Sequence, residues 1–438
     1  MSYTFSKHIG RGGFAQVDIV TNEQGNSFAQ KTYAPDPQLI KAVGDDHLKR
    51  RFVREVRYQS TINHPNIVQI IDFFLVENPP RFIMPLAVCT LRDELQQDPT
   101  LGTNLHTALF DILAGLEHLH SKGLVHRDLK PANVLRFNDE NGLAYYAISD
   151  FGLMSAVNSD SSTLTGTNAN GGTENYAAPE LIGDFRRATA SADIYAFGAI
   201  LHDIFGNAAQ RIPYTELTLP GSVGPIIENC TKRLPLRRYS SVSILRDELY
   251  QVLNTQPVSF NSSNEEAVVN LLRSKTDLND EEWDIVFIQL ARNIDNQIPV
   301  VNILSALSID HIYLLYRQND LFTAMGDYFA EHLRKNQFDF NYCDVLASKA
   351  EQFFNQADIG LQSKIAVALL TLGTSHNRWY VEGKAANMLD NTISTDLAER
   401  IRIEIEVEQL NFRNLINHLC TSIHLQVNFL HPVLQEML

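Results

Sequence analysis

The stretch HRDLKPAN at residues 126–133 decides the fold of this 438-residue chain. It brings an aspartate, a lysine and an asparagine together within six residues. Before it, apolar residues at three- and four-residue spacing across residues 105–119 predict a helix with one buried stripe. After it, residues 143–148 read as an extended run. The sequence therefore predicts a short polar segment between a helix and a strand.

Two further motifs stand on either side of this segment. The glycine-rich stretch GRGGFAQV at residues 10–17 precedes it, and DFG at residues 150–152 follows it. Glycines let backbone N–H groups approach phosphate oxygens. Strand character follows these glycines, where a dinucleotide-binding unit would have a helix, and this favours a hairpin lying over phosphates. With its motifs in order from Gly10 to Arg238, the chain resembles the eukaryotic-like protein kinase family over half of its length.

The resemblance implies an α+β, bilobal protein-kinase fold, with a small β-rich lobe and a larger α-helical lobe. The chain's own pattern agrees, because short strand-like segments give way to mostly helical ones after residue 102. The predicted divisions are a catalytic domain at 1–254 (small lobe about 1–86, large lobe about 87–254), a polar linker at 255–264 and an all-α domain at 265–438.

The resemblance also implies chemical roles for single residues. Lys31 would hold the α- and β-phosphates of ATP, and Glu55 would fix that lysine through an ion pair. Asp128 would orient the substrate hydroxyl and accept its proton, while Lys130 would steady the γ-phosphate. Thr173 would hydrogen-bond Asp128 and Lys130. Phosphoryl transfer needs positioned phosphates, compensating cations and a carboxylate facing the incoming hydroxyl, and these residue types supply them.

ATP and Mg²⁺ are the expected cofactors, with Mn²⁺ as an alternative. Asn133 and Asp150 are the expected metal ligands, because oxygen donors suit a hard cation that also binds phosphates. Adenine would lie beside the segment that joins the lobes, where Met84 forms the back wall, Pro85 offers a carbonyl and Ala87 an N–H. The predicted nucleotide-binding set is Gly10, Gly12, Gly13, Val17, Lys31, Met84, Pro85, Ala87, Asn133 and Asp150.

The expected acceptor is a serine or threonine of a protein. The lysine that follows Asp128-Leu129 resembles serine/threonine rather than tyrosine kinases, and GTENYAAPE at residues 172–180 resembles the segment that floors the family's peptide site. The resemblance also pairs Glu180 with Arg238 and sets Asp193 against the backbone of the catalytic loop. Both of these contacts are expected to be structural rather than chemical.

A polar stretch before this segment contains Thr163, Thr165 and Thr167. We predict that Thr167 or Thr165 is autophosphorylated, because Arg127 beside the catalytic aspartate could pair with a phosphate there. The alternative is a solvated loop that carries no phosphate. The sequence does not decide between them.

Composition excludes several other classes of protein. A formal net charge of −15 argues against binding to nucleic acid or to anionic membranes. Neither a secretory signal nor a sufficiently long apolar stretch is visible. Four widely spaced cysteines predict reduced thiols and a cytoplasmic location rather than disulfides or zinc. His118 and His120 have no third ligand at metal spacing, so packed histidines are expected.

The C-terminal half carries helical patterns and no recognised motif. Asn279 and Glu282 have the spacing of a capping box, and residues 401–407 alternate with period two, which leaves a strand as an alternative there. No fixed-period repeat supports a solenoid. Helices are predicted at 320–335, 343–356, 360–373, 396–409 and 411–425. Partner binding, restraint of the kinase lobes and self-association all stay open as roles for residues 265–438.

Two alternatives to an active protein kinase follow from the sequence. A pseudokinase scaffold would be expected to lack the strand lysine, the catalytic aspartate or the metal aspartate, and Lys31, Asp128 and Asp150 are all present. An interaction protein would depend mainly on the C-terminal half. The substrate and the activating signal are not determined by the sequence.

Overall fold

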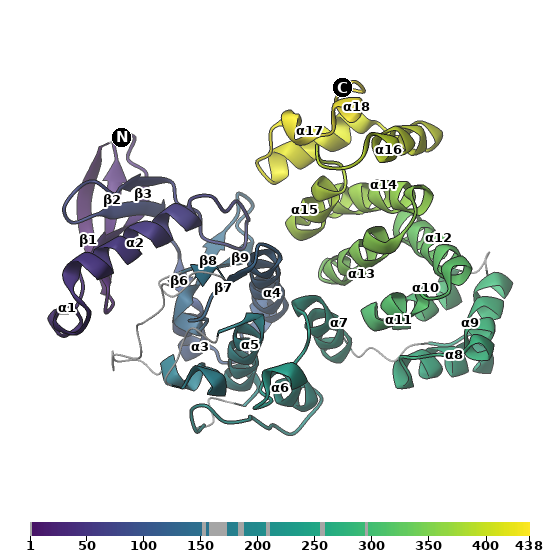
Figure 1. Cartoon of the computed structure of the whole chain (residues 1–438), viewed down its shortest axis with the longest axis horizontal. Coiled ribbons are helices and arrows are strands. Elements are labelled where there is room, and N and C mark those ends of the chain that lie inside the picture. The colour runs from purple at the N-terminus through teal and green to yellow at the C-terminus, as the bar shows by residue number, and fades with distance from the viewer. Residues whose placement is uncertain are drawn as a thin grey trace. The chain divides into compact units, whose positions relative to one another are not determined.

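The computed structural model describes residues 2–150, 155–156, 173–182, 188–206, 211–254, 259–293 and 297–438. The chain divides into two compact units, residues 1–245 and residues 246–438 (Figure 1). Among the described residues, no single helix is both long and apolar enough to cross a membrane. The bent pair Ile298–Ala306 and Ile309–Leu315, which meet at 85°, passes the same test of length and composition only when taken together.

The first unit begins with a five-stranded antiparallel sheet in the order β1-β2-β3-β5-β4. Helix α2 packs against this sheet because Leu48, Phe52 and Val56 recur every four residues and form one apolar face. That face meets Phe82 and Tyr33 from the sheet in one buried cluster. The elements are β1 (Tyr3–Arg11), β2 (Ala15–Asn22), β3 (Ser27–Tyr33), α1 (Pro37–Val43), α2 (Asp45–Gln59), β4 (Asp72–Phe74) and β5 (Arg81–Pro85).

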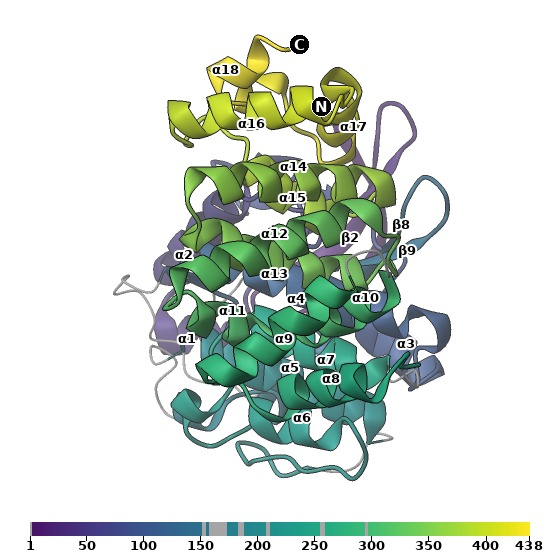
Figure 2. The same cartoon turned by 90° about the vertical axis from the view of Figure 1, so that its right-hand side faces the viewer.

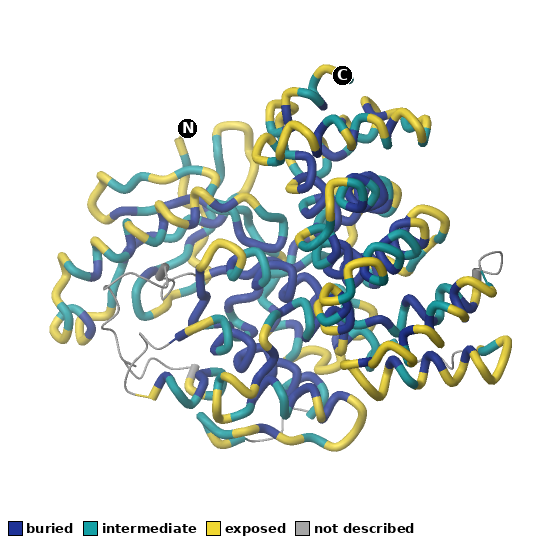
Figure 3. The backbone as a smooth tube through the Cα atoms, turned by 45° about the vertical axis from the view of Figure 1, so that its right-hand side comes forward, coloured by how far each residue is buried: buried dark blue, intermediate teal, exposed yellow. Residues whose placement is uncertain are grey.

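A helical lobe follows within the same unit. Its core helices α4 (Leu105–Ser121) and α5 (Ala190–Phe205) are buried over most of their surface (Figure 3). Gly115 lets α4 lie close to the chain, since a Cβ there would stand 2.6 Å from the Asn66 carbonyl oxygen. The remaining elements are β6 (Cys89–Thr90), α3 (Leu91–Gln97), β7 (Leu124–Val125), β8 (Val134–Asn138), β9 (Ala144–Ile148), β10 (Ser155–Ala156) and α6 (Gly224–Cys230).

Helix α7 (Val242–Leu253) crosses the division between the units. Its residues from Arg246 onward belong to the second unit, where the Arg246 guanidinium donates to the hydroxyls of Ser348 at 3.0 Å and Tyr380 at 2.6 Å. The predicted catalytic domain ended at residue 254. The compact units divide earlier, inside α7, because these side chains pack among the C-terminal helices.

The second unit is a stack of helices in two layers, and Figure 2 shows it rising from α8 and α9 at the bottom to α16, α17 and α18 at the top. In one layer α12 packs on α14 and α14 on α16, and in the other α11 packs on α13, α13 on α15 and α15 on α17. This is a solenoid-like arrangement, and it forms without a sequence repeat of fixed length. The helices are α8 (Ser263–Ser274), α9 (Asp280–Arg292), α10 (Gln297–Ala306), α11 (Ile309–Leu315), α12 (Asn319–Lys335), α13 (Tyr342–Gln356), α14 (Ile359–His376), α15 (Trp379–Asn387), α16 (Thr395–Val407), α17 (Phe412–Ser422) and α18 (Pro432–Gln435).

The predicted C-terminal helices are confirmed, with ends that shift by a few residues. The strand alternative for residues 401–407 is wrong, because Ile401 and Ile405 lie one turn apart on the buried face of α16. The capping box of Asn279 and Glu282 is present at the start of α9.

Candidate active site

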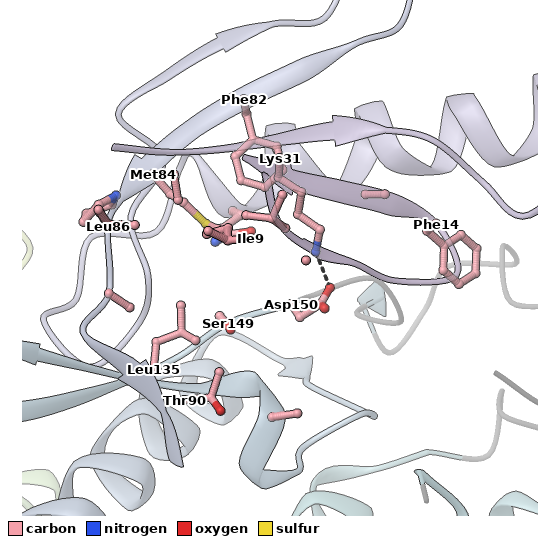
Figure 4. A pocket seen from close by; sticks show the side chains of 18 of the residues that line it. Ile9, Phe14, Lys31, Phe82, Met84, Leu86, Thr90, Leu135, Ser149 and Asp150 are labelled. Carbon is pink, nitrogen blue, oxygen red and sulfur yellow. Dashed lines mark hydrogen bonds and ion pairs between the residues drawn. The ribbon is translucent and has the colours of Figure 1, made fainter. Parts of the chain in front are cut away.

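A cavity of about 610 Å³ lies between the sheet and the helical lobe of the first unit (Figure 4). In Figure 4 Ile9 and Lys31 lie on one side of it and Leu135 on the other. Its volume is within the range of nucleotide- and drug-sized sites. The lining includes the predicted residues Gly10, Val17, Lys31, Glu55, Met84, Pro85, Ala87 and Asp150, whereas Gly12, Gly13 and Asn133 are outside it.

Several apolar lining residues were missed by the sequence analysis. Ile9 and Leu135 face the cavity from opposite lobes, and Phe14 lies at the tip of the glycine hairpin. Leu135 lies in strand β8, two residues beyond Asn133, and belongs to no motif that could have indicated it. The apolar lining residues of α2, Leu48, Phe52 and Val56, could not be recognised, because an apolar helix face carries no motif.

The predicted glycine hairpin is confirmed. Strand β1 ends at Arg11 and strand β2 begins at Ala15, and the Gly12 N–H donates to the Ala15 carbonyl at 2.8 Å to close the turn. A Cβ on Gly10 would meet no atom within 4 Å. The hairpin therefore leaves open space beside the Gly10 backbone, at the edge of the cavity that Gly10 lines.

Lys31 lies in β3 and donates to Asp150 Oδ1 at 2.6 Å. Burial alone would raise the pKa of Asp150, but Lys31 and Lys130 outweigh it and hold that pKa below its usual value. Asp150 is thus an anion beside a cation at the inner end of the cavity.

The predicted ion pair between Lys31 and Glu55 is not formed. Glu55 instead accepts a hydrogen bond from the Nε of Arg51 at 2.9 Å, one turn earlier on the same helix. Burial raises the pKa of Glu55 to about 7, against the opposing effects of Arg51 and Lys31. Arg51 reaches Glu55 by helix geometry alone, and Lys31 is already engaged by Asp150.

The catalytic-loop residues gather around one carboxylate. Lys130 Nζ donates to Asp128 Oδ2 at 2.8 Å, and Asn133 Nδ2 donates to the same oxygen at 3.1 Å. Burial raises the pKa of Asp128, and Lys130 offsets this only in part. A carboxylate with a raised pKa is a stronger proton acceptor, which suits a base positioned for a hydroxyl.

The backbone of this loop is held from below by α5. Asp193, buried on α5, accepts hydrogen bonds from the backbone N–H groups of His126 and Arg127, both at 2.9 Å. The predicted brace is therefore formed. His120 Nε2 lies 2.9 Å from the same carboxylate, so this histidine is packed in the hydrogen-bond network, as expected. Arg127 adopts a left-handed φ of 69°, a conformation that persists where surrounding contacts hold it.

The two predicted metal ligands fit a hard divalent cation. Asn133 turns its amide nitrogen toward Asp128, so its amide oxygen is the group left to bind a cation. Its backbone oxygen accepts from the Ser149 N–H at 2.8 Å, which ties it to the residue before Asp150. An amide oxygen and a carboxylate, completed by phosphates and water, suit Mg²⁺. The described residues contain no cluster of three or more histidine, cysteine, aspartate or glutamate side chains at metal spacing.

The segment 173–182 packs beside the catalytic loop. Ala178 and Leu181 share one buried cluster with Val125, the residue immediately before the loop. The predicted pair of Glu180 and Arg238 is formed by two hydrogen bonds of 2.7 Å. Outside the described part of the chain are Phe151, Gly152, Thr163, Thr165, Thr167 and the side chain of Thr173, so the predictions made for them stay predictions.

Together these features define a class of protein. An antiparallel sheet stands over a helical lobe, a nucleotide-sized cavity opens between them, and Lys31 and Asp150 meet in its wall. Asn133 connects the two aspartates, because its amide nitrogen donates to Asp128 and its carbonyl accepts from the N–H of Ser149, the residue before Asp150. This is the two-lobed fold and site of the protein kinases.

Comparison with known proteins narrows the class to a family. Residues 3–216 match the family model described as "Protein kinase domain". Serine/threonine-protein kinase KIN28 of Saccharomyces cerevisiae is 30% identical over 224 residues, which cover 50% of this chain and 66% of that protein. CBL-interacting serine/threonine-protein kinase 24 of Arabidopsis thaliana is 33% identical over 224 residues, covering 50% and 46%. The chain belongs to the eukaryotic-like serine/threonine protein kinase family through this domain.

A bacterial relative matches the same region. The probable serine/threonine-protein kinase PknB of Lactococcus lactis is 33% identical over 220 residues, which cover 48% of this chain and 32% of that protein. The chain thus spans between about a third and two thirds of the length of these three relatives.

Proposed function

We propose that this protein transfers the γ-phosphoryl group of ATP to serine or threonine hydroxyls of other proteins. The observation that carries the proposal is the Lys31–Asp150 contact of 2.6 Å at the inner end of the cavity, beside the cluster of Asp128, Lys130 and Asn133. A cation for phosphate, a carboxylate for metal and a carboxylate for the acceptor then stand in one place.

Each residue contributes a distinct step. Pro85 and Ala87 both line the cavity, and the carbonyl of Pro85 and the N–H of Ala87 would bind and orient adenine. Lys31 draws the phosphates inward, and Lys130 steadies the group being transferred. Asp128 orients the incoming hydroxyl and takes its proton, a role supported by its raised pKa.

The metal is proposed to be Mg²⁺, with Mn²⁺ as an alternative. Asn133 and Asp150 would hold it through one oxygen each, and when bound it would neutralise charge on the phosphates. The preference for serine or threonine rests on Lys130 and on the predicted contact of Thr173. A cytoplasmic location is supported by the four free cysteines.

The helical unit is proposed to bind a partner or a second copy of this chain. Stacked helices present extended surfaces, which is the property that repeat-like proteins use for recognition. The stacking of α11 to α17 is the observation that supports this proposal. Restraint of the kinase lobes remains the alternative, to be judged by the kinase rate after removal of the later helices.

The catalytic proposal is tested with purified full-length protein, Mg·ATP and a general protein substrate. We expect phosphoserine or phosphothreonine in the product and a loss of about 10²–10⁴-fold in rate for Asp128→Asn, since a positioned base contributes about that much. Calorimetric binding of Mg·ATP should persist in the variant. If Asp128→Asn transfers phosphate at the wild-type rate, or the wild type fails to transfer it, the proposal is wrong and the pseudokinase alternative gains support.

A further inference from the structure

The segment 173–182 is held at two points by arginine, and only one of them was anticipated. Near the end of the segment, the Arg238 guanidinium donates to both carboxylate oxygens of Glu180. Arg211 acts nearer its start: its Nε donates to the Asn175 carbonyl at 3.1 Å. No motif of the sequence analysis included Arg211, yet its side chain is only 6% exposed.

Arg211 is at the centre of a three-residue cluster. Its guanidinium donates to both carboxylate oxygens of Asp203, at 2.5 and 3.2 Å, and it lies 4.6 Å over the ring of Tyr176. The Tyr176 hydroxyl donates to Asp203 Oδ2 at 2.6 Å. Burial, followed by the charge of Asp203, raises the pKa of Tyr176, so the hydroxyl stays a neutral donor. The Asp203 carboxylate therefore accepts three hydrogen bonds from within the chain.

The cluster and the catalytic loop are both held by helix α5. Asp203 lies on α5, as does Asp193, which holds the backbone of His126 and Arg127. Ten residues of helix separate the two aspartates, which corresponds to about 15 Å along a single rigid axis. Arg211 also donates to the Ala199 carbonyl of α5 at 2.8 Å. One helix thus sets the distance between the loop that carries Asp128 and the start of segment 173–182.

We propose that Arg211 is a positioning residue for the phosphoacceptor protein. It fixes the start of segment 173–182 relative to the catalytic loop, and it neutralises Asp203 so that this surface offers no free carboxylate to a basic side chain. The inference rests on the proposed function and deepens it. It implies that the site does not select lysine or arginine at any substrate position that comes within reach of Asp203.

Arg238 and Arg211 differ in the effect expected from their removal. Arg238 has a fully buried side chain and also donates to the carbonyls of Ser191 and Lys232, at 2.9 and 2.7 Å. Its removal should destabilise the lobe as a whole. Asp203 is 20% exposed, so removal of Arg211 leaves a carboxylate that a substrate can reach.

The test uses full-length protein with Arg211→Met, Arg211→Lys and the double variant Asp203→Asn/Arg211→Met. Initial rates are measured on a peptide library that differs in basic residues around the acceptor, together with KM for ATP and the melting temperature. Loss of a bidentate charged contact is worth about a tenfold effect. We expect Arg211→Met to raise peptide KM about tenfold, to leave KM for ATP within about twofold, and to shift preference toward basic peptides.

The other variants separate positioning from simple structural support. Arg211→Lys should recover part of the peptide KM, and the double variant should lose the new preference for basic peptides because no carboxylate is left. An active wild type whose peptide preference and KM are unchanged by Arg211→Met overturns the inference alone, as does a uniform loss that tracks the melting temperature. A wild type that transfers no phosphate overturns the proposed function and the inference together.

Discussion

Two lysine–aspartate pairs, one in each unit, differ in how far they are exposed to solvent. Lys31 contacts Asp150 at 2.6 Å, and the aspartate side chain is 45% exposed. Lys349 lies 3.5 Å from Asp247, and the two side chains are 0% and 10% exposed. Burial lowers the pKa of Lys349 and raises that of Asp247, so both charges are held at a cost. A pair that faces a cavity can change partners, whereas a pair in a core can only specify packing.

Other charged side chains in the core of the helical unit are also buried and in contact with partners. Arg378 donates to both oxygens of Asp344 at 2.8 and 2.6 Å, with both side chains nearly inaccessible. Arg246 is fully buried and lies 4.2 Å over the Tyr380 ring. Such groups are costly unless each has its partner. The Lys31–Asp150 pair therefore keeps its charges open to a cavity, whereas the charges of Lys349 and Arg378 are paired inside the helical core.

The largest effect is expected from Lys349→Met. It leaves Asp247 buried without its cation, and breaking a buried pair in this way costs about 3–5 kcal/mol of unfolding free energy. Urea denaturation of the full chain measures it, while the kinase rate per folded molecule should not change. Adding Asp247→Leu should restore part of the loss, because the remaining charge is removed as well. An unchanged midpoint in Lys349→Met would mean that the core pair is unimportant.

Lys31→Met tests the pair that faces the cavity. It removes the cation expected to hold phosphate and should reduce kcat by about 10²–10³-fold. Stability should change by no more than about 1 kcal/mol, because the Asp150 it leaves is partly exposed. Lys41→Met, on the exposed surface of α1, is the matched control and should keep full activity. Similar rates for Lys31→Met and the control would contradict the role of Lys31.

The sequence was sufficient to bring the candidate site residues together and to predict most helices, for different reasons. Lys31, Asp128 and Asp150 belong to motifs whose order and spacing resemble those of the protein kinases. The C-terminal helices follow from apolar spacing and from local caps such as Asn279, which are interactions between near neighbours in the chain. Short-range physics of this kind can be recognised in a single sequence.

Contacts between distant residues could not be predicted. Lys349 is one polar residue on a helix that is buried on every side from Tyr342 to Ala350, and its partner lies on α7. The Lys31–Glu55 pair failed for the opposite reason: a family pattern indicated it, but Arg51 stands one turn from Glu55 and forms the local contact.

The stability of the helical unit should depend on pH through one buried carboxyl group, that of Glu382. Glu382 on α15 is fully buried, accepts from the Ser422 hydroxyl at 2.6 Å and lies 3.1 Å from His418 Nε2. Burial raises its pKa from an ordinary 4.5 to about 7, against the effect of Ser422. A raised pKa means that the folded chain prefers the protonated acid. The stabilising contribution is complete below pH 4.5 and is lost as the pH rises through about 7.

Glu382→Gln removes this titration. The wild type should lose about 2–3 kcal/mol of stability relative to the variant between pH 5 and pH 8.5, in proportion to the shift in pKa. Denaturation curves at several pH values measure the difference. His418→Asn serves as the control for the neighbouring imidazole and should leave the dependence in place. A wild type and a Glu382→Gln variant with parallel pH profiles would show that this carboxyl does not titrate as expected.

The smallest effect is expected from Lys364→Met, which isolates burial as the variable. Lys364 on α14 pairs with Asp327 on α12 at 2.8 Å, a shorter contact than that of Lys349, but the side chains are 40% and 44% exposed. Water competes for both charges, so the loss should be about 0.5 kcal/mol or less and should shrink further in salt. Urea midpoints of Lys364→Met and Lys349→Met, measured side by side, give the comparison directly. If the exposed pair proved as costly to break as the buried one, then the distance between the charges, rather than their removal from water, would govern the stability of this unit.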